Sequence, residues 1–545
     1  MPYNEQTETV TVIFYLFCRI GIFTKDNYIL NVICRPGELG GHMVGKVISA
    51  AVSGVTARLV EVEADIAAGI PSFELTGNLG GTAKEARERV RTALRNSKIR
   101  LNSGRITVNL APANIRKEGP HFDLAIAAAL LCACGLVPQE ATQGVLFAGE
   151  LRLDGGVNEV NAVLPMIISA AEAGMRRCIV PKGNMREGGF IDGIEVVGVS
   201  SLEECVSYLK GEKGLPPAGK FRFESVQESG GIDFGDIKGQ RSLKRAVTVA
   251  AAGMHNLLMI GPPGSGKTMT AERLPTILPP LDYEQRTEIW RIYSVAGLLD
   301  GEALRMGKRP FRSPHHTVTA QTMAGGGRNP MPGEMSLAQH GILFLDEINL
   351  FDSRTVETLR EPLENGRVRI NRVGGAVEYP ADFMLVAAMN PCRCGYYPDR
   401  RKCRCTPSDI KRHFGHISRP IMDRIDICVQ APTVAYEDIG GGGDMYDSAY
   451  MRKDVERAFK AQQKRFENCG FDFNSEIPAA LTAEYCRLEA QAEILMKKAY
   501  EGYGMSARGY YKILRTARTI ADIEGNELIK TENISEAIGY KAVTE

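Results

Sequence analysis

The residues most able to do chemistry form a glycine-rich loop between an apolar segment and a polar one. Residues 257–260 read Leu-Leu-Met-Ile and run into Gly-Pro-Pro-Gly-Ser-Gly-Lys-Thr at 261–268, after which Met269 opens a helical pattern. Glycines let backbone N–H groups crowd around phosphates, and a helix N-terminus adds the positive end of a dipole. We expect Lys267 to reach the β- and γ-phosphates of ATP and Thr268 to bind Mg²⁺.

A second apolar segment supplies the carboxylates that hydrolysis needs. Residues 341–345 are expected to form a buried strand that ends at Asp346 and Glu347. An aspartate there holds Mg²⁺ through water, and the adjacent glutamate polarises the attacking water. A third apolar strand, 384–388, ends at Asn390. The expected nucleotide-binding residues are Gly261, Pro262, Pro263, Gly264, Ser265, Gly266, Lys267, Thr268, Met269 and Asp346.

Length and composition limit the class of protein. The chain has 545 residues, enough for three or four domains at roughly 150 residues each. Its formal net charge of +1 means that any nucleic-acid contact must come from a local patch. Most of the 13 cysteines are scattered, which favours reduced thiols and a cytoplasmic protein over a disulfide framework. No apolar run reaches the roughly 18 residues of a membrane span, so no membrane partner is expected.

The apolar pattern divides the chain into five parts. Residues 1–42 are expected to be an N-terminal extension, either a disordered tail or an upstream mis-start, because organised sequence begins at Met43. Short β-rich runs alternate with helical stretches over 43–210, which predicts an α+β domain, and a linker with Gly and Pro follows at 211–231. Strands and helices alternate over 232–435, which predicts a parallel sheet with helices on both faces. Residues 436–545 are almost wholly helical, with one helix expected over 483–500, and are expected to form a lid.

Four cysteines crowd into one short stretch. Cys392-Arg-Cys394 and Cys403-Arg-Cys405 are joined by a loop with Gly, Tyr and Pro. Two such pairs can close a tetrahedral S₄ site, which favours Zn²⁺, and nearby basic residues would offset the thiolate charge. Four free thiols or two redox disulfides are the alternatives, because C-x-C pairs are less diagnostic than C-x-x-C. The interpretation is a structural zinc knuckle over 392–405.

Basic residues mark a candidate DNA contact. Residues 368–380 have Gly374 and a second glycine at the centre, which predicts a β-hairpin just before the Asn390 strand. Its Arg369 and Arg372 could contact phosphates. The alternative is a structural hairpin whose arginines are solvated. The preceding insert also carries basic residues and a pair of histidines at 315–316, but no third ligand is apparent, so we do not expect a metal there.

Several segments together resemble one family, the magnesium-chelatase-like AAA+ ATPases of the ComM/YifB group. The resemblance runs from Met43 to the end of the chain. The segments that carry it are Asp-Ile-Lys-Gly-Gln at 236–240, Arg-Ser-Pro-His-His at 312–316, Gly-Gly-Gly at 325–327, Pro-Gly-Glu at 332–334, Asn-Pro-Cys at 390–392 and Ser-Ala-Arg at 506–508.

The resemblance implies roles for further polar residues. Asn390 would sense the γ-phosphate. Arg424 would be the arginine finger that acts in the site of the neighbouring subunit, which implies a ring, and we expect a homo-hexamer. Arg508 would be the second sensor arginine. One departure from the family pattern places Arg419 near the expected subunit interface, so either Arg419 or Arg424 could act in trans.

The N-terminal domain resembles the Lon-protease-like fold (ribosomal S5 domain 2-like). His121 stands where Lon has its nucleophilic serine, and Leu164 stands where Lon has its lysine. Both halves of the protease dyad are absent, so no proteolysis is expected. The overall fold class is therefore α/β, with a P-loop AAA+ module and helical lid preceded by this α+β domain.

The family resemblance implies a hexameric DNA motor. It would load on single-stranded or branched DNA and drive branch migration in recombination and natural transformation, with recombination proteins as further partners. The alternative is a chelatase-like or protein-remodelling ATPase that acts on a protein partner. Stimulation of the ATPase by DNA would separate these two hypotheses.

Overall fold

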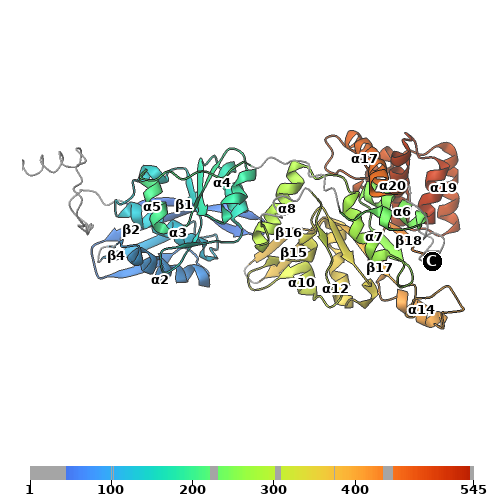
Figure 1. Cartoon of the computed structure of the whole chain (residues 1–545), viewed down its shortest axis with the longest axis horizontal. Coiled ribbons are helices and arrows are strands. Elements are labelled where there is room, and N and C mark those ends of the chain that lie inside the picture. Colours follow the sequence, from blue (N-terminus) through green and yellow to red (C-terminus); the bar gives the residue numbers. More distant parts are fainter. Residues whose placement is uncertain are drawn as a thin grey trace, which may run out of the picture.

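The computed structural model describes residues 44–99, 101, 104–220, 231–300, 308–372, 375–433 and 446–540. The predicted N-terminal extension lies outside these residues, as do 221–230 of the predicted linker, the predicted turn glycine Gly374 and the side chain of Arg372. Figure 1 shows an N-terminal module (blue to teal) and a larger C-terminal module (green to red). None of the described helices is both long and apolar enough to cross a membrane.

The N-terminal module is built around a mixed sheet of seven strands in the order β3-β4-β2-β1-β5-β8-β9. Val47 of β1 packs in the layer of helices α2 and α3, whereas Ala50 packs in the layer of α4. Successive side chains of a strand point to opposite faces, so helices cover both sides of this sheet. The elements are β1 (Gly45–Ser53), β2 (Thr56–Ala67), β3 (Ser72–Thr76), β4 (Arg105–Ala111), β5 (Val145–Phe147), β8 (Arg177–Pro181), β9 (Glu195–Val199), α2 (Gly81–Asn96), α3 (Asp123–Ala133), α4 (Val163–Glu172) and α5 (Leu202–Leu209).

The C-terminal module contains a parallel sheet of five strands in the order β11-β14-β17-β10-β18. Leu257 of β10 enters the apolar core beside α6, and its neighbour Leu258 enters the core on the other face. The expected parallel sheet with both faces covered is confirmed. The elements are β10 (Leu257–Ile260), β11 (Phe311–Arg312), β14 (Ile342–Leu345), β17 (Met384–Met389), β18 (Ile427–Gln430), α6 (Arg241–Gly253), α7 (Lys267–Arg273), α10 (Ala320–Ala324), α11 (Glu334–Leu337), α12 (Ser353–Glu357), α13 (Pro362–Asn365), α14 (Pro407–Phe414) and α15 (Arg419–Met422).

The helical region that follows consists of α17 (Ser448–Arg465), α18 (Thr482–Tyr485), α19 (Ala490–Gly502), α20 (Ala507–Glu524) and α21 (Thr531–Gly539). The apolar pattern over 483–500 suggests one helix, but the structure has a break between α18 and α19. Leu488 forms a β-bridge with Ile529, and the N–H of Glu489 donates to the carbonyl of Ile529 at 2.9 Å. A partner distant in sequence therefore takes the backbone hydrogen bonds that would have continued the helix.

Helix α8 (Tyr283–Ala296) of the C-terminal module docks against the N-terminal module (Figure 1). The ring of Trp290 is 2% exposed and packs against Phe190, with centroids 4.3 Å apart. The hydroxyl of Tyr283 donates to the carbonyl of Phe190 at 2.9 Å. The Ser294 carbonyl accepts the N–H of Ala162 at 2.9 Å. One helix thus supplies apolar and polar contacts across the junction.

The same junction covers Leu164, one of the two positions that the sequence comparison set against the Lon protease dyad. Leu164 is buried at the start of α4, and its N–H donates to Glu187 at 3.0 Å and to the Ser294 hydroxyl at 3.2 Å. Ser294 in turn donates to Glu187 at 2.6 Å. Burial raises the pKa of Glu187. Leu164, expected at the position of the Lon lysine, is thus a structural contact between the modules.

The other dyad position is equally enclosed. His121 is buried, and its Nε2 donates to the carbonyl of Ala50 at 2.9 Å. Burial lowers the pKa of His121 to about 4, so the ring is neutral at physiological pH. The residue at the serine position therefore supports the fold and is not exposed to a substrate.

Candidate nucleotide-hydrolysis site

The candidate nucleotide site lies at the carboxyl ends of β10, β14 and β17, which are neighbours in the sheet. The loop after β10 turns through Gly264 (φ 76°) and Gly266 (φ 79°), a region that favours glycine. Lys267 opens α7, and its ammonium group donates to the carbonyls of Gly261 at 2.8 Å and Pro262 at 2.9 Å. The lysine therefore lies folded over the concave side of its own loop.

Four polar side chains lie at this edge with Lys267. The Thr268 hydroxyl donates to Asp346 Oδ2 at 2.7 Å. Asn390 lies between Lys267 and Glu347, with 3.4 Å from its Oδ1 to the lysine Nζ and 3.4 Å from its Nδ2 to the glutamate Oε1. Burial lowers the pKa of Lys267, and the charges of Asp346 and Glu347 oppose that shift. The structure thus brings together five residues that the sequence places on three separate segments.

Gln240 is a contributor to this site that motif analysis did not single out. Its side-chain amide donates to the carbonyls of Ser265 at 2.7 Å and Pro432 at 3.1 Å. The residue comes directly before α6 and so ties the phosphate loop to two other segments. Of the remaining predicted loop residues, Ser265 is buried and Met269 is 42% exposed on the outer side of α7. The only sequence signal for Gln240 was its membership of the 236–240 segment.

The predicted arginine finger, Arg424, and the predicted second sensor arginine, Arg508, share one carboxylate. Arg424 Nη2 donates to Glu364 Oε2 at 2.5 Å, and Arg508 Nη2 donates to Glu364 Oε1 at 2.8 Å. Arg424 is buried, whereas the side chain of Arg508 is half-exposed. The hydrogen bond from Arg424 is the main cause that holds the pKa of Glu364 below its usual value. Glu364 stands on α13, outside every motif, so the sequence did not reveal it.

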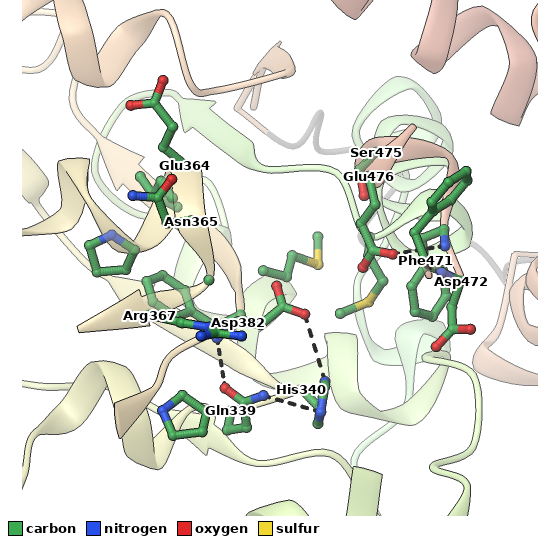
Figure 2. A pocket seen from close by; sticks show the side chains of 18 of the residues that line it. Gln339, His340, Glu364, Asn365, Arg367, Asp382, Phe471, Asp472, Ser475 and Glu476 are labelled. Atoms are coloured by element: carbon green, nitrogen blue, oxygen red, sulfur yellow. Dashed lines mark hydrogen bonds and ion pairs between the residues drawn. The ribbon is translucent and has the colours of Figure 1, made fainter. Parts of the chain in front are cut away.

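These three side chains line a cavity of about 1500 Å³ between the sheet module and the helical region. Figure 2 shows Asp382 and His340 on one side of it and Glu476 on the other. Among the described residues that line the cavity, none belongs to the phosphate loop at 261–268. Arg424 and Arg508 therefore lie on a surface separate from the chain's own phosphate loop.

Arg419, the alternative arginine, lies in the first turn of α15. Its side chain is exposed, and it forms no ion pair with any residue in the described part of the chain. It does not line the cavity that holds Arg424 and Arg508. Of the two candidates, only Arg424 is held in place by a carboxylate.

The four clustered cysteines converge as their spacing predicted. Their sulfur atoms all lie within 4.8 Å of one another, and Cys392 Sγ is 3.3 Å from Cys394 Sγ and 3.7 Å from Cys403 Sγ. A tetrahedral Zn²⁺ with Zn–S bonds of about 2.3 Å would place its sulfurs about 3.8 Å apart. All four cysteines, Cys405 included, are free of disulfides. This donor set therefore fits a tetrahedral thiolate-bound metal.

The cysteine segment touches the nucleotide site at two points. Gly395 packs so closely on the Pro263 ring that an added Cβ would lie 2.6 Å from its Cδ. The His413 ring nitrogen Nε2 donates to the carbonyl of Asn390 at 2.8 Å. The segment therefore contacts both the phosphate loop and the strand end that carries Asn390.

The predicted hairpin is present as β15 (Arg367–Arg372) and β16 (Gly375–Pro380). Tyr379 is buried with Ala162 and Val295, so the hairpin packs against the N-terminal module and α8. Arg369 is exposed and without an ion-pair partner among the described residues, whereas Arg367 pairs with Glu378 at 2.8 Å. Arg369 is thus available to a ligand.

The basic insert before β14 has a structural role in its described part. Arg309 is buried and donates to the carbonyls of Pro279 at 2.9 Å and His340 at 2.7 Å. Arg312 donates to both carboxylate oxygens of Glu334, at 2.7 and 2.9 Å. These arginines are therefore occupied within the chain and are not free for DNA.

Comparison with protein families gives three matches along the chain. Residues 233–439 match the family described as magnesium chelatase, subunit ChlI. Residues 62–184 match subunit ChlI of Mg-chelatase, and residues 445–541 match the magnesium chelatase subunit ChlI C-terminal family. The matches therefore cover the nucleotide site, most of the N-terminal module and the helical region.

Comparison with curated proteins finds relatives of nearly full length. The chain is 38% identical over 503 residues to competence protein ComM of Haemophilus influenzae, covering 91% of this chain and 97% of that protein. It is 36% identical over 500 residues to the uncharacterized protein YifB of Escherichia coli, covering 90% and 95%. A shorter match, 27% over 199 residues, links 34% of this chain to 24% of the Lon protease of Trichlorobacter lovleyi. The predicted fold class is confirmed by these matches together with the architecture described above.

Proposed function

Because this chain belongs to the magnesium-chelatase-like AAA+ ATPases that include ComM and YifB, we propose that it is a ring-forming motor that couples ATP hydrolysis to movement along DNA. Membership of this family implies ATPase activity with ATP and Mg²⁺. The observation that supports the hydrolysis chemistry best is the meeting of Lys267, Thr268, Asp346, Glu347 and Asn390 at one edge of the sheet.

Each of these residues has a distinct proposed task. Lys267 leaves its loop carbonyls for the β- and γ-phosphates, which are stronger acceptors because they are charged. Thr268 and Asp346 would hold Mg²⁺, which neutralises phosphate charge when bound. Glu347 accepts a proton from the attacking water, and Asn390, 3.4 Å from Glu347, orients that water toward the γ-phosphate.

The shared carboxylate of Glu364 supports a ring. Arg424 lines a surface apart from the chain's own phosphate loop, as a residue that acts on a neighbouring subunit's nucleotide must. In the single chain, Glu364 holds both guanidinium groups in one place. The γ-phosphate of the neighbour competes with Glu364 for Arg424, so ATP in one subunit would release Arg424 of the next subunit from Glu364.

DNA is the proposed substrate of the motor. The support is the exposed Arg369 on the β15–β16 hairpin and the similarity to a relative whose name denotes competence. An arginine without a partner can neutralise a backbone phosphate and release counterions. Arg372 stays a predicted contact of the same hairpin. Branch migration in recombination and natural transformation is the proposed process.

Zinc is the proposed ion of the cysteine cluster. The sulfur separations near 3.3 and 3.7 Å match a tetrahedral thiolate site better than they match pairs of bonded sulfurs at about 2.05 Å. The proposed role is structural, because four protein ligands leave no open position for a substrate. The ion would fix the loop that packs on Pro263.

The test is the steady-state ATPase rate of the full chain with and without a four-way DNA junction, at fixed salt. Strong stimulation supports the DNA motor, and Arg369→Ala should then weaken the stimulation without changing the basal rate. Lys460→Ala, which removes an exposed cation of α17, is the matched control and should respond like the parent. Robust basal hydrolysis that DNA does not change would refute the DNA substrate and favour a protein-remodelling ATPase.

A further inference from the structure

The segment that contains the cysteine knuckle carries a concentrated positive charge. We define the knuckle segment as residues 391–420, which include α14 and the start of α15. It has two carboxylates, Asp399 and Asp409, and eight cations, while the whole chain has a net charge of only +1. The eight cations are Arg393, Arg400, Arg401, Lys402, Arg404, Lys411, Arg412 and Arg419, and all are exposed.

This charge is not neutralised within the protein. None of the eight cations forms an ion pair with any residue in the described ranges. The two carboxylates of the segment are engaged with backbone groups: Asp409 accepts the N–H of Thr406 at 3.0 Å, and Asp399 accepts the N–H of Arg401 at 2.9 Å. A divalent ion held by four thiolates would leave a charge of about −2, which offsets only a minority of the cations. The surplus is therefore available to a polyanion outside the chain.

Two tyrosines accompany the cations. Tyr396 is 45% exposed, and the ammonium group of Lys402 is 5.9 Å from its ring centroid. The guanidinium group of Arg400 is 5.3 Å from the ring centroid of Tyr397. An exposed aromatic ring among cations is a combination that binds single-stranded nucleic acids, because a base stacks on the ring while the cations neutralise the backbone. A merely acidic protein surface would not need the rings.

We propose that the knuckle segment is a second nucleic-acid contact. It binds a single strand of nucleic acid, with Tyr396 as a stacking platform, and couples this binding to the nucleotide site. The inference rests on the proposed function for the identity of the polyanion as DNA. Figure 1 shows α14 (orange) projecting from the C-terminal module on the side remote from the N-terminal module. The contact is thus distinct from the β15–β16 hairpin, which packs against the N-terminal module.

Two contacts link this surface to ATP hydrolysis. Gly395, the neighbour of Tyr396, packs on the ring of Pro263 in the phosphate loop. His413, directly after Arg412, donates to the carbonyl of Asn390 at 2.8 Å. A nucleic-acid strand bound to the segment would therefore shift the phosphate loop and Asn390 through these direct contacts. DNA binding at this surface would raise the rate of hydrolysis.

The experiment measures binding of a fluorescein-labelled thymidine oligonucleotide to the full chain by fluorescence anisotropy over a range of salt. One variant combines Arg400→Ala, Arg401→Ala and Lys402→Ala. The loss of three phosphate contacts should weaken binding roughly tenfold or more and reduce the slope of log K against log salt by about 2. The matched control removes three exposed cations of α2, at Lys84, Arg87 and Arg91, and should bind like the parent.

A second variant separates stacking from charge. Tyr396→Ala should weaken binding about tenfold with an unchanged salt slope, and Tyr396→Phe, which keeps a ring, should bind like the parent. Thermal melting with ATP present checks that each variant is folded. In the variants that bind poorly, DNA should stimulate hydrolysis less at a given DNA concentration.

The outcomes distinguish this inference from the proposed function. If the parent binds and the charge variant binds equally well with the same salt slope, the knuckle contact is refuted while the DNA motor stands. If the parent does not bind DNA, the proposed function itself fails. If the charge variant fails only to assemble with ATP, and its assembled fraction binds DNA normally, the segment contacts a neighbouring subunit and the inference is overturned.

Discussion

Replacement of Trp290 by alanine should loosen the N-terminal module from the C-terminal module while both stay folded. The ring is 2% exposed and packs among residues of the N-terminal module, with Phe190 at 4.3 Å between centroids. Burial of about 200 Å² of an indole at about 25 cal/mol per Å² contributes roughly 5 kcal/mol, and buried Trp→Ala changes cost about 3–5 kcal/mol. Most of this loss falls on docking, because Trp290 belongs to one module and its partners to the other.

The remaining contacts set how far docking weakens. The hydrogen bonds of Tyr283 and Ser294 to the N-terminal module persist in the variant, at about 1 kcal/mol each. A net loss of about 4 kcal/mol lowers the docking equilibrium roughly a thousandfold, since every 1.4 kcal/mol is tenfold.

Calorimetry and hydrogen exchange of the full chain measure this effect. We expect the unfolding of the N-terminal module to separate from that of the C-terminal module and shift to lower temperature, with faster exchange around Phe190 and the start of α4. Glu284→Ala removes an exposed side chain from the same helix and should leave both readouts unchanged. If the Trp290→Ala protein melted and exchanged like the Glu284→Ala control, α8 would not be the element that joins the modules.

Three further changes test other parts of the structure. The pKa of His121 falls from 6.5 to about 4 on burial. The unfolded state therefore binds a proton more readily, and the folded state loses stability as the pH falls from 6.5 toward 4. At pH 5 the free energy of unfolding should be about 2 kcal/mol lower than above pH 6.5. His121→Gln should therefore make urea stability less sensitive to pH over this range, and an unchanged sensitivity would show that the ring is not buried as a neutral group. The variants Arg424→Ala and Lys267→Ala should each be inactive alone but recover ATPase activity when mixed. In the mixture, the Lys267→Ala subunit supplies an intact Arg424 to the intact phosphate loop of the Arg424→Ala subunit. Mixtures that stay inactive at all ratios would argue against action in trans. Cys405→Ala should lower bound zinc, measured by atomic absorption, well below one per chain, whereas Cys134→Ala should not; equal zinc content in both would locate the metal elsewhere.

Local patterns in the sequence were sufficient to predict the nucleotide site. The strand, loop and helix around Lys267 are contiguous, so periodicity and glycine spacing identify them without long-range information. The carboxylates of Asp346 and Glu347 follow a continuously apolar run, and such a run likewise predicts a strand that is buried in a parallel sheet. Because the carboxyl ends of parallel strands meet at one edge, the convergence of these residues follows from the order of the elements.

Local patterns failed where a distant segment supplies the partner. The helix expected over 483–500 is interrupted because Leu488 pairs with Ile529, a contact that no local propensity contains. Gln240 and Glu364 escaped notice for the same reason, since their partners are on other segments. Glu364 is a single glutamate on a short helix, and nothing in the neighbouring sequence indicates that it binds Arg424 and Arg508.

The sequence by itself determined which residues form the candidate nucleotide site, since the identities of Lys267, Asp346 and Glu347 and their attachment to apolar strands are encoded locally. Only the tertiary structure decided how that candidate site is connected to the rest of the molecule. Glu364 is 60 positions from Arg424 and 144 from Arg508, yet it binds both. Such contacts arise because burial of apolar side chains packs whole helices and sheets together. This packing places polar side chains from distant segments side by side, and no periodic pattern in the sequence identifies them.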